Sequence, residues 1–380
     1  MKKFIDIILP YKEIFNKNKA SAVSLTILNS FKFSKFKRNI RIFGRIEKNP
    51  FLKKNYFSLK TNRILGFGNN RSLIKSYYNY TKNDNYRKIV EIHNRPIFFK
   101  YLIKKKIKHP ITIHFHNDPT KMNGSSTVKE RDFIARNSAA VYFVSKFIKK
   151  KFCLNLNKKY KNLHVIMNGI QRTLKKKPKK EKIILFVGRL IEAKGIILFL
   201  NAIEKLLNNN VNWRFLIIGT IKPGYLIKRN YFSLQSKTDR NGLIIIDKIK
   251  KLTKKFKNLK HINFSNNKTV QNYMKKSSIL IAPSIWEDPC PLTHIEGLSN
   301  GCALVTSTKG GIPEIVNKNA IMIKKLSSQN LYNKIKILIT NKNLLKKYHK
   351  LSWNRYNLNI NKLVKKQDFI RKKILKVNFI

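Results

Sequence analysis

Short apolar runs rich in β-branched residues recur along the whole chain of 380 residues, and longer helical or lysine-rich segments separate them. This alternation is typical of β-α units, in which helices join parallel strands. The runs in the first half are FIDIILP (4–10), NIRIFG (39–44), RILGFG (63–68), KIVEIHN (88–94), PITIHFHND (110–118), AVYFVS (140–145) and HVIMNG (164–169). Those in the second half are IILFVG (183–188), RFLIIG (214–219), HINFSN (261–266), SILIAPS (278–284), ALVTST (303–308) and AIMIKK (320–325). We therefore expect two similar α/β halves, each built on a parallel sheet.

The stretch TLKKKPKKEK (173–182) lies between the two series of strands and is basic, with one proline, so we interpret it as a linker. The first domain then covers residues 1–172 and the second covers 183–330, which suits a chain of this length. Residues 331–380 show helix-like apolar spacing and no strand pattern. We expect them to form C-terminal helices that pack back toward the first domain.

The composition is strongly basic, with 82 Lys and Arg against 18 Asp and Glu, a net charge of +64. A hydrophobic content of 42% and 24 Phe nevertheless exclude a disordered chain. Such charge can indicate binding to nucleic acid or to anionic lipid, or lysine can simply fill the solvated positions. The even spread of lysine favours the last explanation. YLIKKKIK (101–108) and SKFIKKKF (145–152) interleave bases with apolar groups, however, and could rest on acidic headgroups.

The start of the chain, MKKFIDIILPYK, is basic, but its apolar run is short and Asp6 interrupts it. We interpret it as a buried strand rather than a signal peptide. Nowhere do eighteen apolar residues run together, as a membrane-spanning helix requires. Cys153, Cys290 and Cys302 are odd in number and lie far apart, which suggests neither a disulfide framework nor a zinc site. These features favour a cytoplasmic protein, either free or peripheral on the inner face of the cell membrane.

The window from Ser277 to Val316 contains one lysine and no arginine, although an even spread of bases would place eight or nine there. It also carries three carboxylates within ten residues, Glu287, Asp288 and Glu296. Burial alone explains the missing lysines. It does not explain the carboxylates, because an unpaired buried charge is costly. We therefore expect a polar ligand or partner to face this segment.

The local pattern predicts a helix after the strand SILIAPS, because Pro289 and Pro291 break the chain and Gly301 closes the segment PLTHIEGLSNG. The N–H groups of Leu292, Thr293 and His294 would then be free at a helix N-terminus, which favours phosphate. Asp288 and Glu296 would lie in the same cleft. A sugar nucleotide needs this combination, with donors for its diphosphate and acceptors for its hydroxyl groups.

A second segment, FVGRLIEAKG (186–195), predicts a strand that ends at Gly188 and a helix that begins near Lys194. Arg189 and Lys194 flank the crossover, so both cations can point at a phosphate at the carboxyl edge of the sheet. Lysine is so common in this chain that Lys194 could equally be an ordinary surface residue.

Taken together, these segments resemble the retaining GT-B glycosyltransferases of the large fourth family, which use sugar nucleotides to build polysaccharides and glycolipids. The resemblance covers residues 85–325, and five segments occur in the family's order. They are VEIHNRP (90–96) with HFHNDP (114–119), VIMNGI (165–170), GRLIEAKG (188–195), the acidic pair Asp288 and Glu296, and GGIPEIV (310–316). It implies two Rossmann-like domains that face each other across a cleft, followed by a helical C-terminal tail.

The resemblance also implies roles for the matched positions. Glu296 would hold the ribose, Asp288 the hydroxyls of the donor sugar, and Arg189 with Lys194 the diphosphate. His116 would face the transferred sugar from the other domain. Further donor contacts would come from Gly188, Leu292, Thr293, Gly310 and Gly311, and acceptor contacts from His93, Asn94 and Asp118. The family needs no cofactor and usually no metal, and its acceptor is a glycan or a lipid-linked sugar.

Three positions depart from the family's pattern. The first acidic residue is usually Glu and here is Asp288, one methylene shorter. Pro291 stands where glycine is common and removes one N–H donor. The glycine-rich loop expected after the first strand is missing, because NKNKASAVSLTIL (16–28) has no glycine. The contacts expected from the first domain are therefore the ones that the resemblance supports least.

Several candidate residues also have ordinary structural explanations. His114 and His116 are two residues apart on one strand and could be buried core histidines. His93 and Asn94 could cap a strand, and we interpret His294 as a packing residue. Gly310 and Gly311 favour a functional role, because glycine lets a backbone approach a ligand closely.

Two functions compete with sugar transfer. A basic nucleic-acid-binding protein would show steep salt dependence and no turnover of sugar nucleotides. A GT-B-fold sugar-nucleotide epimerase would give a product without any acceptor. Nucleic acid is the partner that we expect least.

Overall fold

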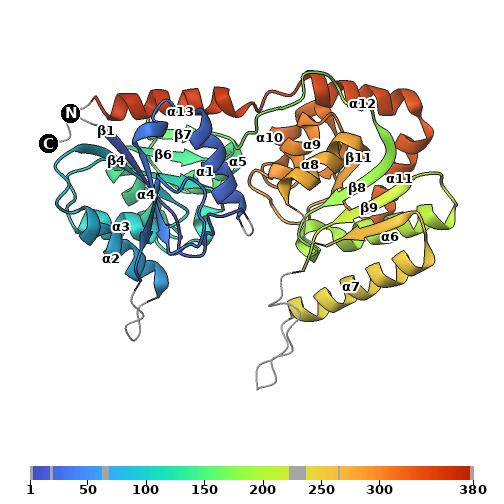
Figure 1. Cartoon of the computed structure of the whole chain (residues 1–380), viewed down its shortest axis with the longest axis horizontal. Helices are drawn as coiled ribbons and strands as arrows, with labels where there is room; N and C mark the ends of the chain where they lie inside the picture. Colours follow the sequence, from blue (N-terminus) through green and yellow to red (C-terminus); the bar gives the residue numbers. More distant parts are fainter. Residues whose placement is uncertain (1–2, 18–19, 62–67, 222–236, 264–265, 377–380) are drawn as a thin grey trace. The chain divides into compact units, whose positions relative to one another are not determined.

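The computed structural model describes residues 3–17, 20–61, 68–221, 237–263 and 266–376, with the side chains of residues 237–241 left out. The chain divides into two compact units (Figure 1). The first contains residues 1–171 and 358–380, and the second contains residues 172–357.

The first unit is built on a parallel sheet with the strand order β3-β2-β1-β4-β5-β6-β7. Its strands are β1 (Lys3–Ile8), β2 (Ile40–Arg45), β3 (Tyr56–Leu59), β4 (Arg87–His93), β5 (Ile111–Phe115), β6 (Ala140–Phe143) and β7 (Leu163–Val165). Its helices are α1 (Ala22–Phe33), α2 (Asn69–Thr81), α3 (Pro96–Lys104), α4 (Val128–Asn137), α5 (Lys146–Cys153) and α13 (Ile360–Ile374). The order reverses between β1 and β4, as in doubly wound folds.

Helices cover both faces of this sheet, because alternate residues of each strand point to opposite sides. Ile5 and Ile7 pack against α1, and Ile89 and Tyr142 pack against α13 on the same side. Residues that alternate with these along the strands point to the opposite face. Phe115, for example, packs against α5. The C-terminal helix therefore returns to the first unit (Figure 1).

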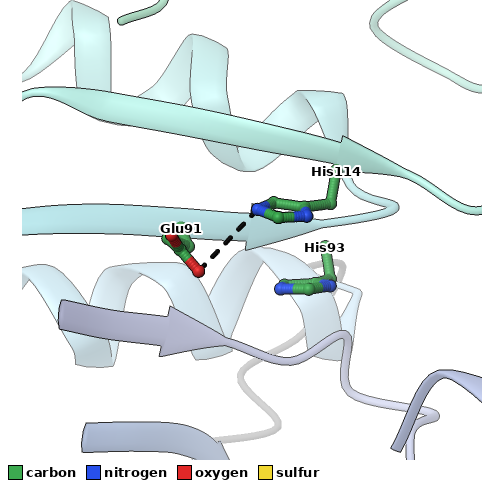
Figure 2. Close-up of side chains that lie close together, drawn as sticks. All are labelled: Glu91, His93 and His114. Carbon is green, nitrogen blue, oxygen red and sulfur yellow. Dashed lines mark ion pairs between the residues drawn. The ribbon is translucent and has the colours of Figure 1, made fainter. Parts of the chain in front are cut away.

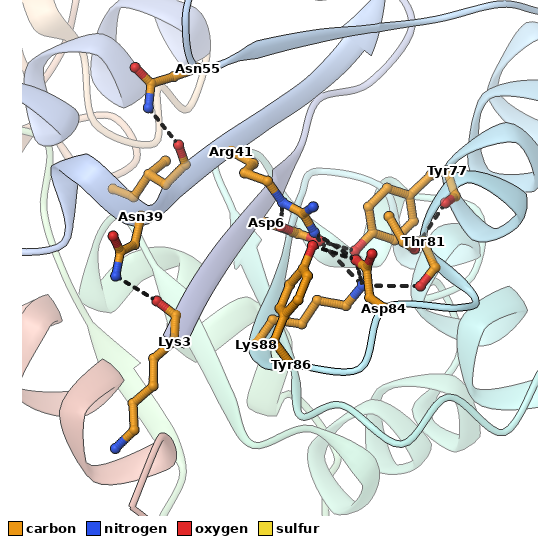
Figure 3. A network of polar contacts seen from close by, with 11 residues as sticks. Lys3, Asp6, Asn39, Arg41, Asn55, Tyr77, Thr81, Asp84, Tyr86 and Lys88 are labelled. Atoms are coloured by element: carbon orange, nitrogen blue, oxygen red, sulfur yellow. Dashed lines mark hydrogen bonds and ion pairs between the residues drawn. The ribbon is translucent and has the colours of Figure 1, made fainter. Parts of the chain in front are cut away.

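Asp6, the acidic residue in the first strand, is fully buried and neutralised. Both carboxylate oxygens of Asp6 accept hydrogen bonds from Arg41, each at 2.7 Å, and one of them also accepts from the Tyr77 hydroxyl at 2.7 Å (Figure 3). Asp84 links Arg41 to Lys88, at 2.9 and 2.8 Å. Two carboxylates and two cations thus balance each other, which explains how a buried β1 tolerates Asp6.

The second unit has a parallel sheet with the order β10-β9-β8-β11-β12-β13. Its strands are β8 (Glu181–Val187), β9 (Arg214–Ile218), β10 (Leu259–Ile262), β11 (Ser277–Ala282), β12 (Ala303–Ser307) and β13 (Ala320–Ile323). Its helices are α6 (Ile196–Asn208), α7 (Lys237–Lys255), α8 (Asn267–Lys276), α9 (Leu292–Ser299), α10 (Ile312–Val316), α11 (Ser328–Thr340) and α12 (Lys342–Asn354). Here the order reverses between β8 and β11.

The structure divides the C-terminal region differently from the single set of helices expected at 331–380. Leu331, Ile335 and Leu338 of α11 are buried in the core of the second unit, and α12 belongs to that unit as well. Only α13 packs on the first unit. The strand β3 lies outside the predicted runs, and most of the predicted run 63–68 lies outside the described residues.

Candidate active site

The carboxyl edge of the second sheet brings together the segments that the sequence singled out. β8 and β11 are neighbours at the point where the strand order reverses, and residues 188–195 and 283–291 follow them. In open α/β sheets, ligands bind outside the carboxyl ends of the strands at this switch point. The acidic segment and the Arg-Lys segment therefore share the edge where a ligand is expected.

Direct backbone contacts fix these loops against each other. The N–H groups of Ile285 and Trp286 both donate to the carbonyl of Ala193, at 3.0 and 3.1 Å. Gly195 has φ +74°, and a Cβ there would lie 2.0 Å from the carbonyl oxygen of Pro283. Only glycine combines that backbone angle with so close an approach.

The glycine pair after β12 packs on the same acidic segment. Gly310 has φ +61°, and an added Cβ would lie 2.5 Å from the carbonyl oxygen of Asp288. The N–H of Gly311 donates to that oxygen at 2.9 Å. The conformation of these glycines thus positions the peptide that carries Asp288.

Lys194 and Asp288 form an ion pair across the two loops. Asp288 is buried, and the Lys194 ammonium also lies 5.5 Å from the centre of the Trp286 ring. Arg189 is exposed and forms no ion pair with any residue that the structure describes. One cation of the predicted pair is therefore held by a carboxylate, and the other is available to an anion.

The helix after the acidic segment begins one residue later than the sequence indicates, because Pro291 is the N-cap residue and Leu292 is the first residue of α9. No side chain in the described part of the chain caps this end. The first N–H groups of a helix have no partner within it. Those of Leu292, Thr293 and His294 remain as donors.

Glu296 lies one turn inside α9, and among the described residues no hydrogen bond joins it to Asp288. Its carboxylate accepts a hydrogen bond from the Asn267 side chain of α8 at 3.0 Å. Burial raises the pKa of Glu296 to about 7, although hydrogen bonds from Asn267 and Gln271 oppose the shift. The side chain is only partly covered by the residues around it.

His294 on the same helix is buried, and its Nε2 lies 2.7 Å from the Thr306 hydroxyl. Burial lowers the pKa of His294 to about 4, so the ring is neutral. This arrangement agrees with a packing role.

Three histidines of the first unit gather on one face of its sheet. His93 at the end of β4 stacks on His114 of β5, with ring centres 4.3 Å apart, and His93 Nδ1 lies 2.8 Å from His116 Nε2. Burial, with further effects from neighbouring residues, lowers the pKa of all three rings, that of His116 to about 3. A cavity of about 40 Å³ is lined by these rings and by Tyr142 and Arg371, among others. The cluster is therefore uncharged.

A buried ion pair lies beneath the histidines. Arg371 of α13 donates to both oxygens of Glu91, at 2.8 and 2.7 Å, and to Asp368 at 2.9 Å. All three side chains are buried. Glu91 and Arg371 are 280 residues apart in the chain, so this pair attaches the C-terminal helix to β4.

Glu91, His93 and His114 offer three potential metal ligands within 4.8 Å of one another (Figure 2). The two imidazole planes are within 12° of parallel, with ring centres 4.3 Å apart, so their in-plane lone pairs lie in two separate, nearly parallel planes and do not converge on one point. Both Glu91 oxygens already accept from Arg371, whose positive charge would repel a cation. The geometry therefore suits a neutral stacked pair better than a metal ion.

The remaining acceptor-side candidates have local structural contacts. The side chain of Asn94, which has φ +52°, accepts the backbone N–H of His116 at 2.8 Å. Asp118 caps a short helical turn by accepting from Thr120 N at 2.9 Å. Asn94 thus positions His116, whereas Asp118 shows a capping role.

Sequence reasoning missed two contributors to these sites. Trp286, 39% exposed, lies beside Lys194, and its place next to the acidic residues could have indicated it. Asn267 carries no comparable pattern, because its contact with Glu296 depends on the packing of α8 against α9.

Most of the chain is similar to known proteins. Residues 169–357 match the family described as glycosyl transferases group 1. An uncharacterized glycosyltransferase of Methanocaldococcus jannaschii is 26% identical over 278 residues, which are 69% of this chain and 70% of that protein.

Among solved structures, HepE of Anabaena in complex with UDP has a TM-score of 0.74 at 13% identity, covering 98% of this chain and 100% of that one. WaaG, a glycosyltransferase involved in lipopolysaccharide biosynthesis, has a TM-score of 0.66 at 12% identity, covering 97% of this chain and 99% of that one. These likenesses confirm the expected two-sheet GT-B architecture. Residues 169–357 form a group 1 glycosyltransferase domain, and the chain is a glycosyltransferase with the GT-B fold.

Proposed function

We propose that the protein transfers a sugar, of the hexose type, from a nucleotide-sugar donor to a glycan or lipid-linked acceptor with retention of configuration. The observation that carries this proposal is the edge of the second sheet. Two cations and Asp288 lie there on loops held together by backbone contacts, and the next helix, α9, adds uncapped N–H groups and Glu296. Diphosphate, ribose and sugar are the chemical groups that such a set can bind together. The complex of HepE with UDP supports a nucleotide donor.

The diphosphate binds where the positive groups are. Arg189 is exposed and can form two parallel hydrogen bonds to phosphate oxygens, and the N–H groups of Leu292 and Thr293 add donors at the start of α9. Lys194 bonds the phosphate while it keeps Asp288 in place. The negative charge that develops on the leaving diphosphate is stabilised by these groups, which is the main source of rate acceleration in such a reaction.

The carboxylates bind hydroxyl groups. Asp288 is held by Lys194 and by the glycine pair, and it accepts hydrogen bonds from the donor sugar. Glu296 accepts from the ribose in its ionised form. His116 of the first unit is neutral, so it can donate one hydrogen bond to a substrate hydroxyl without adding charge.

We propose that the reaction needs no metal ion or other cofactor. The cations named above supply the positive charge, and the histidine cluster does not present converging ligands. The three histidines also lack the charge that a diphosphate site would use.

The biological setting that we propose is the synthesis of cell-surface polysaccharide or lipopolysaccharide on the cytoplasmic side of the membrane. The likeness to WaaG supports it, and so does the basic composition. None of the helices in the described stretches is both long and apolar enough to cross a bilayer. Attachment to the membrane would then be peripheral.

A transfer assay tests the proposal. Sugar nucleotides with uridine, guanosine and adenosine bases are screened for thermal stabilisation, and the donor that binds is used for turnover. Glu296→Ala should abolish transfer while the protein stays folded. Glu204→Ala is the matched control, because Glu204 forms only a surface ion pair with Lys248. Full activity of Glu296→Ala would overturn the assignment.

A further inference from the structure

The outer face of α13 has a regular arrangement of exposed side chains. Its inner face is buried against the first unit and includes Ile360, Val364, Ile370 and Ile374. The exposed positions are Lys362, Lys365, Lys366, Phe369, Lys372, Lys373 and, just past the helix end, Lys376. At 100° per residue these seven side chains span an arc of about 120°. Six lysines thus share one face of the helix, and no carboxylate is among them.

Phe369 lies at the centre of this arc. Three lysines fall on each side of it when the helix is viewed along its axis. The ring is 59% exposed, and among the large apolar side chains of the described residues only Ile46, at 61%, is more exposed. The Lys373 ammonium lies 4.6 Å from the ring centre.

Buried contacts fix the orientation of the helix, so the exposure of Phe369 does not come from loose packing. Asp368, the preceding residue, accepts hydrogen bonds from the Ser34 hydroxyl at 2.9 Å and from Lys35 N at 2.7 Å. Arg371, two residues after Phe369, pairs with Glu91. Rotating the helix to bury the ring would break both sets of contacts.

More cations lie beside the helix. The bond between Asp368 and Lys35 N places the turn after α1 next to α13, and this turn carries exposed Lys35, Lys37 and Arg38. The basic surface therefore extends beyond the helix itself.

A lysine-rich chain would show basic helix faces by composition alone, and α12 provides the comparison. Its exposed positions include Lys342, Lys346, Lys347 and Lys350, together with Asn343 and Asn354. No large apolar side chain is exposed on this helix. The apolar residue at the centre of the lysines is what distinguishes α13 from α12.

We propose that the outer face of α13 docks the protein on an anionic lipid bilayer. Phenylalanine among lysines is the composition of helices that lie in the membrane interface. Each lysine contributes about 1 kcal/mol near an anionic surface, and its aliphatic stem can lie along the acyl boundary while the ammonium contacts headgroups. The proposal assigns the peripheral membrane attachment suggested above to α13, and it rests on that part of the proposed function. It does not depend on which donor or acceptor the enzyme uses.

The basic runs found in the sequence are on the other side of the first sheet. Residues 101–108 include the end of α3, residues 145–152 include most of α5, and α5 packs on the face opposite α13. A flat bilayer against α13 does not reach them. They serve as a competing surface in the test.

The experiment is vesicle co-sedimentation of the full chain with phosphatidylcholine containing 30% phosphatidylglycerol, and with phosphatidylcholine alone. One variant replaces Lys362, Lys365, Lys372 and Lys376 with Gln. The matched controls replace four exposed lysines of α12 (342, 346, 347 and 350) or four near the end of α3 (104, 105, 106 and 108). Phe369→Ser and Phe369→Trp test the ring.

The α13 lysine variant should lose binding to the anionic vesicles by about 100-fold or more, and both controls should stay within about threefold of the unmodified protein. Phe369→Ser should weaken binding by about 10-fold, and Phe369→Trp should retain it. Equal losses in all three lysine variants, no loss in the α13 variant, or no binding of the unmodified protein would overturn the proposal. The same variants are also tested for binding to a duplex RNA of 20 base pairs. If the α13 variant loses RNA binding but keeps vesicle binding, the proposal is overturned as well.

Hydrolysis of the donor in solution separates this proposal from the proposed function. The α13 variants should hydrolyse or transfer the donor sugar at the unmodified rate, because the donor-binding residues belong to the second unit. If no sugar nucleotide is turned over by any form while vesicle binding follows the predictions, the proposed function fails and the docking surface stands.

Discussion

The two sets of candidate residues differ in how they are held. In the second unit, Lys194, Asp288 and Glu296 are carried by loops and by the start of a helix, and Arg189 and the first N–H groups of α9 are available to a ligand. In the first unit, His93, His114 and Glu91 are packed in a neutral, buried layer that Arg371 anchors. The residues of the second unit are arranged for ligand binding, and those of the first unit for rigidity. Substitutions should therefore affect donor binding in the second unit and stability in the first.

Removing Arg371, which attaches α13 to β4, should have the largest effect on stability. Arg371→Met leaves Glu91 and Asp368 buried without their cation and should destabilise that unit by about 3 to 5 kcal/mol. Hydrogen exchange of β4 and α13 measures the loss. Arg371→Met combined with Glu91→Met should recover part of it, whereas unchanged protection in the single variant would show that the pair does not hold the helix.

Removing Arg189 from the second unit should affect catalysis but not stability. Arg189→Ala should lower kcat/KM by about 100-fold, the usual cost of one preorganised donor to a developing charge. Its exposed side chain makes no ion pair in the described residues, so the melting temperature should stay unchanged. Arg214→Ala serves as control, because Arg214 forms only an exposed pair with Glu181. Equal activity of the two variants would remove Arg189 from the site.

The raised pKa of Glu296 predicts a pH effect on stability. The folded protein keeps this proton up to about pH 7, whereas an unfolded glutamate loses it near pH 4.3. The folded state thus binds more protons between these values, so the contribution of Glu296 to stability falls as pH rises through this window. Glu296→Gln should gain about 2 kcal/mol at most, relative to the unmodified protein, between pH 5 and pH 8. Thermal melts at the two pH values measure the change, and an equal difference at both would contradict the shift.

The smallest effect should come from His116, the histidine of the cluster that we propose to contact substrate. His116→Ala removes one neutral hydrogen bond, worth about 1 kcal/mol, and should lower kcat/KM by about 5- to 10-fold. His114→Ala, which has no direct contact with His116 Nε2, should alter stability more than turnover. If His116→Ala costs as much as Arg189→Ala, the histidine cluster takes a larger part in the reaction than its neutral, packed state suggests.

Much of the fold follows from local patterns that the sequence displays. The runs beginning at Phe4, Lys88 and Ser278 lie in β1, β4 and β11, because continuous β-branched runs between helices suit buried parallel strands. β3 is only four residues long and was missed. We expected the C-terminal helices to pack toward the first domain, but the residues that attach α13 could not be predicted, since no local pattern marks a pair between residues 91 and 371.

The candidate site could likewise be predicted only in part. The low lysine content around Asp288 and the position of Arg189 directly after a strand indicated the edge of the second sheet. The contact between Lys194 and Asp288, and the one between Asn267 and Glu296, arise from loops and helices brought together by the sheet order. Residue type and spacing cannot show such pairings, because they depend on side-chain geometry across the fold.

The measurement that tests the account most directly is hydrogen exchange of the full chain with and without a saturating sugar nucleotide. We expect protection of residues 188–195 and 284–294 and of the glycine pair at 310 and 311, with little change in β1 to β3. The strongest protection should fall on the amides of Leu292 and Thr293. No protection in these segments with any donor that raises the melting temperature would contradict the proposal that this edge binds the donor.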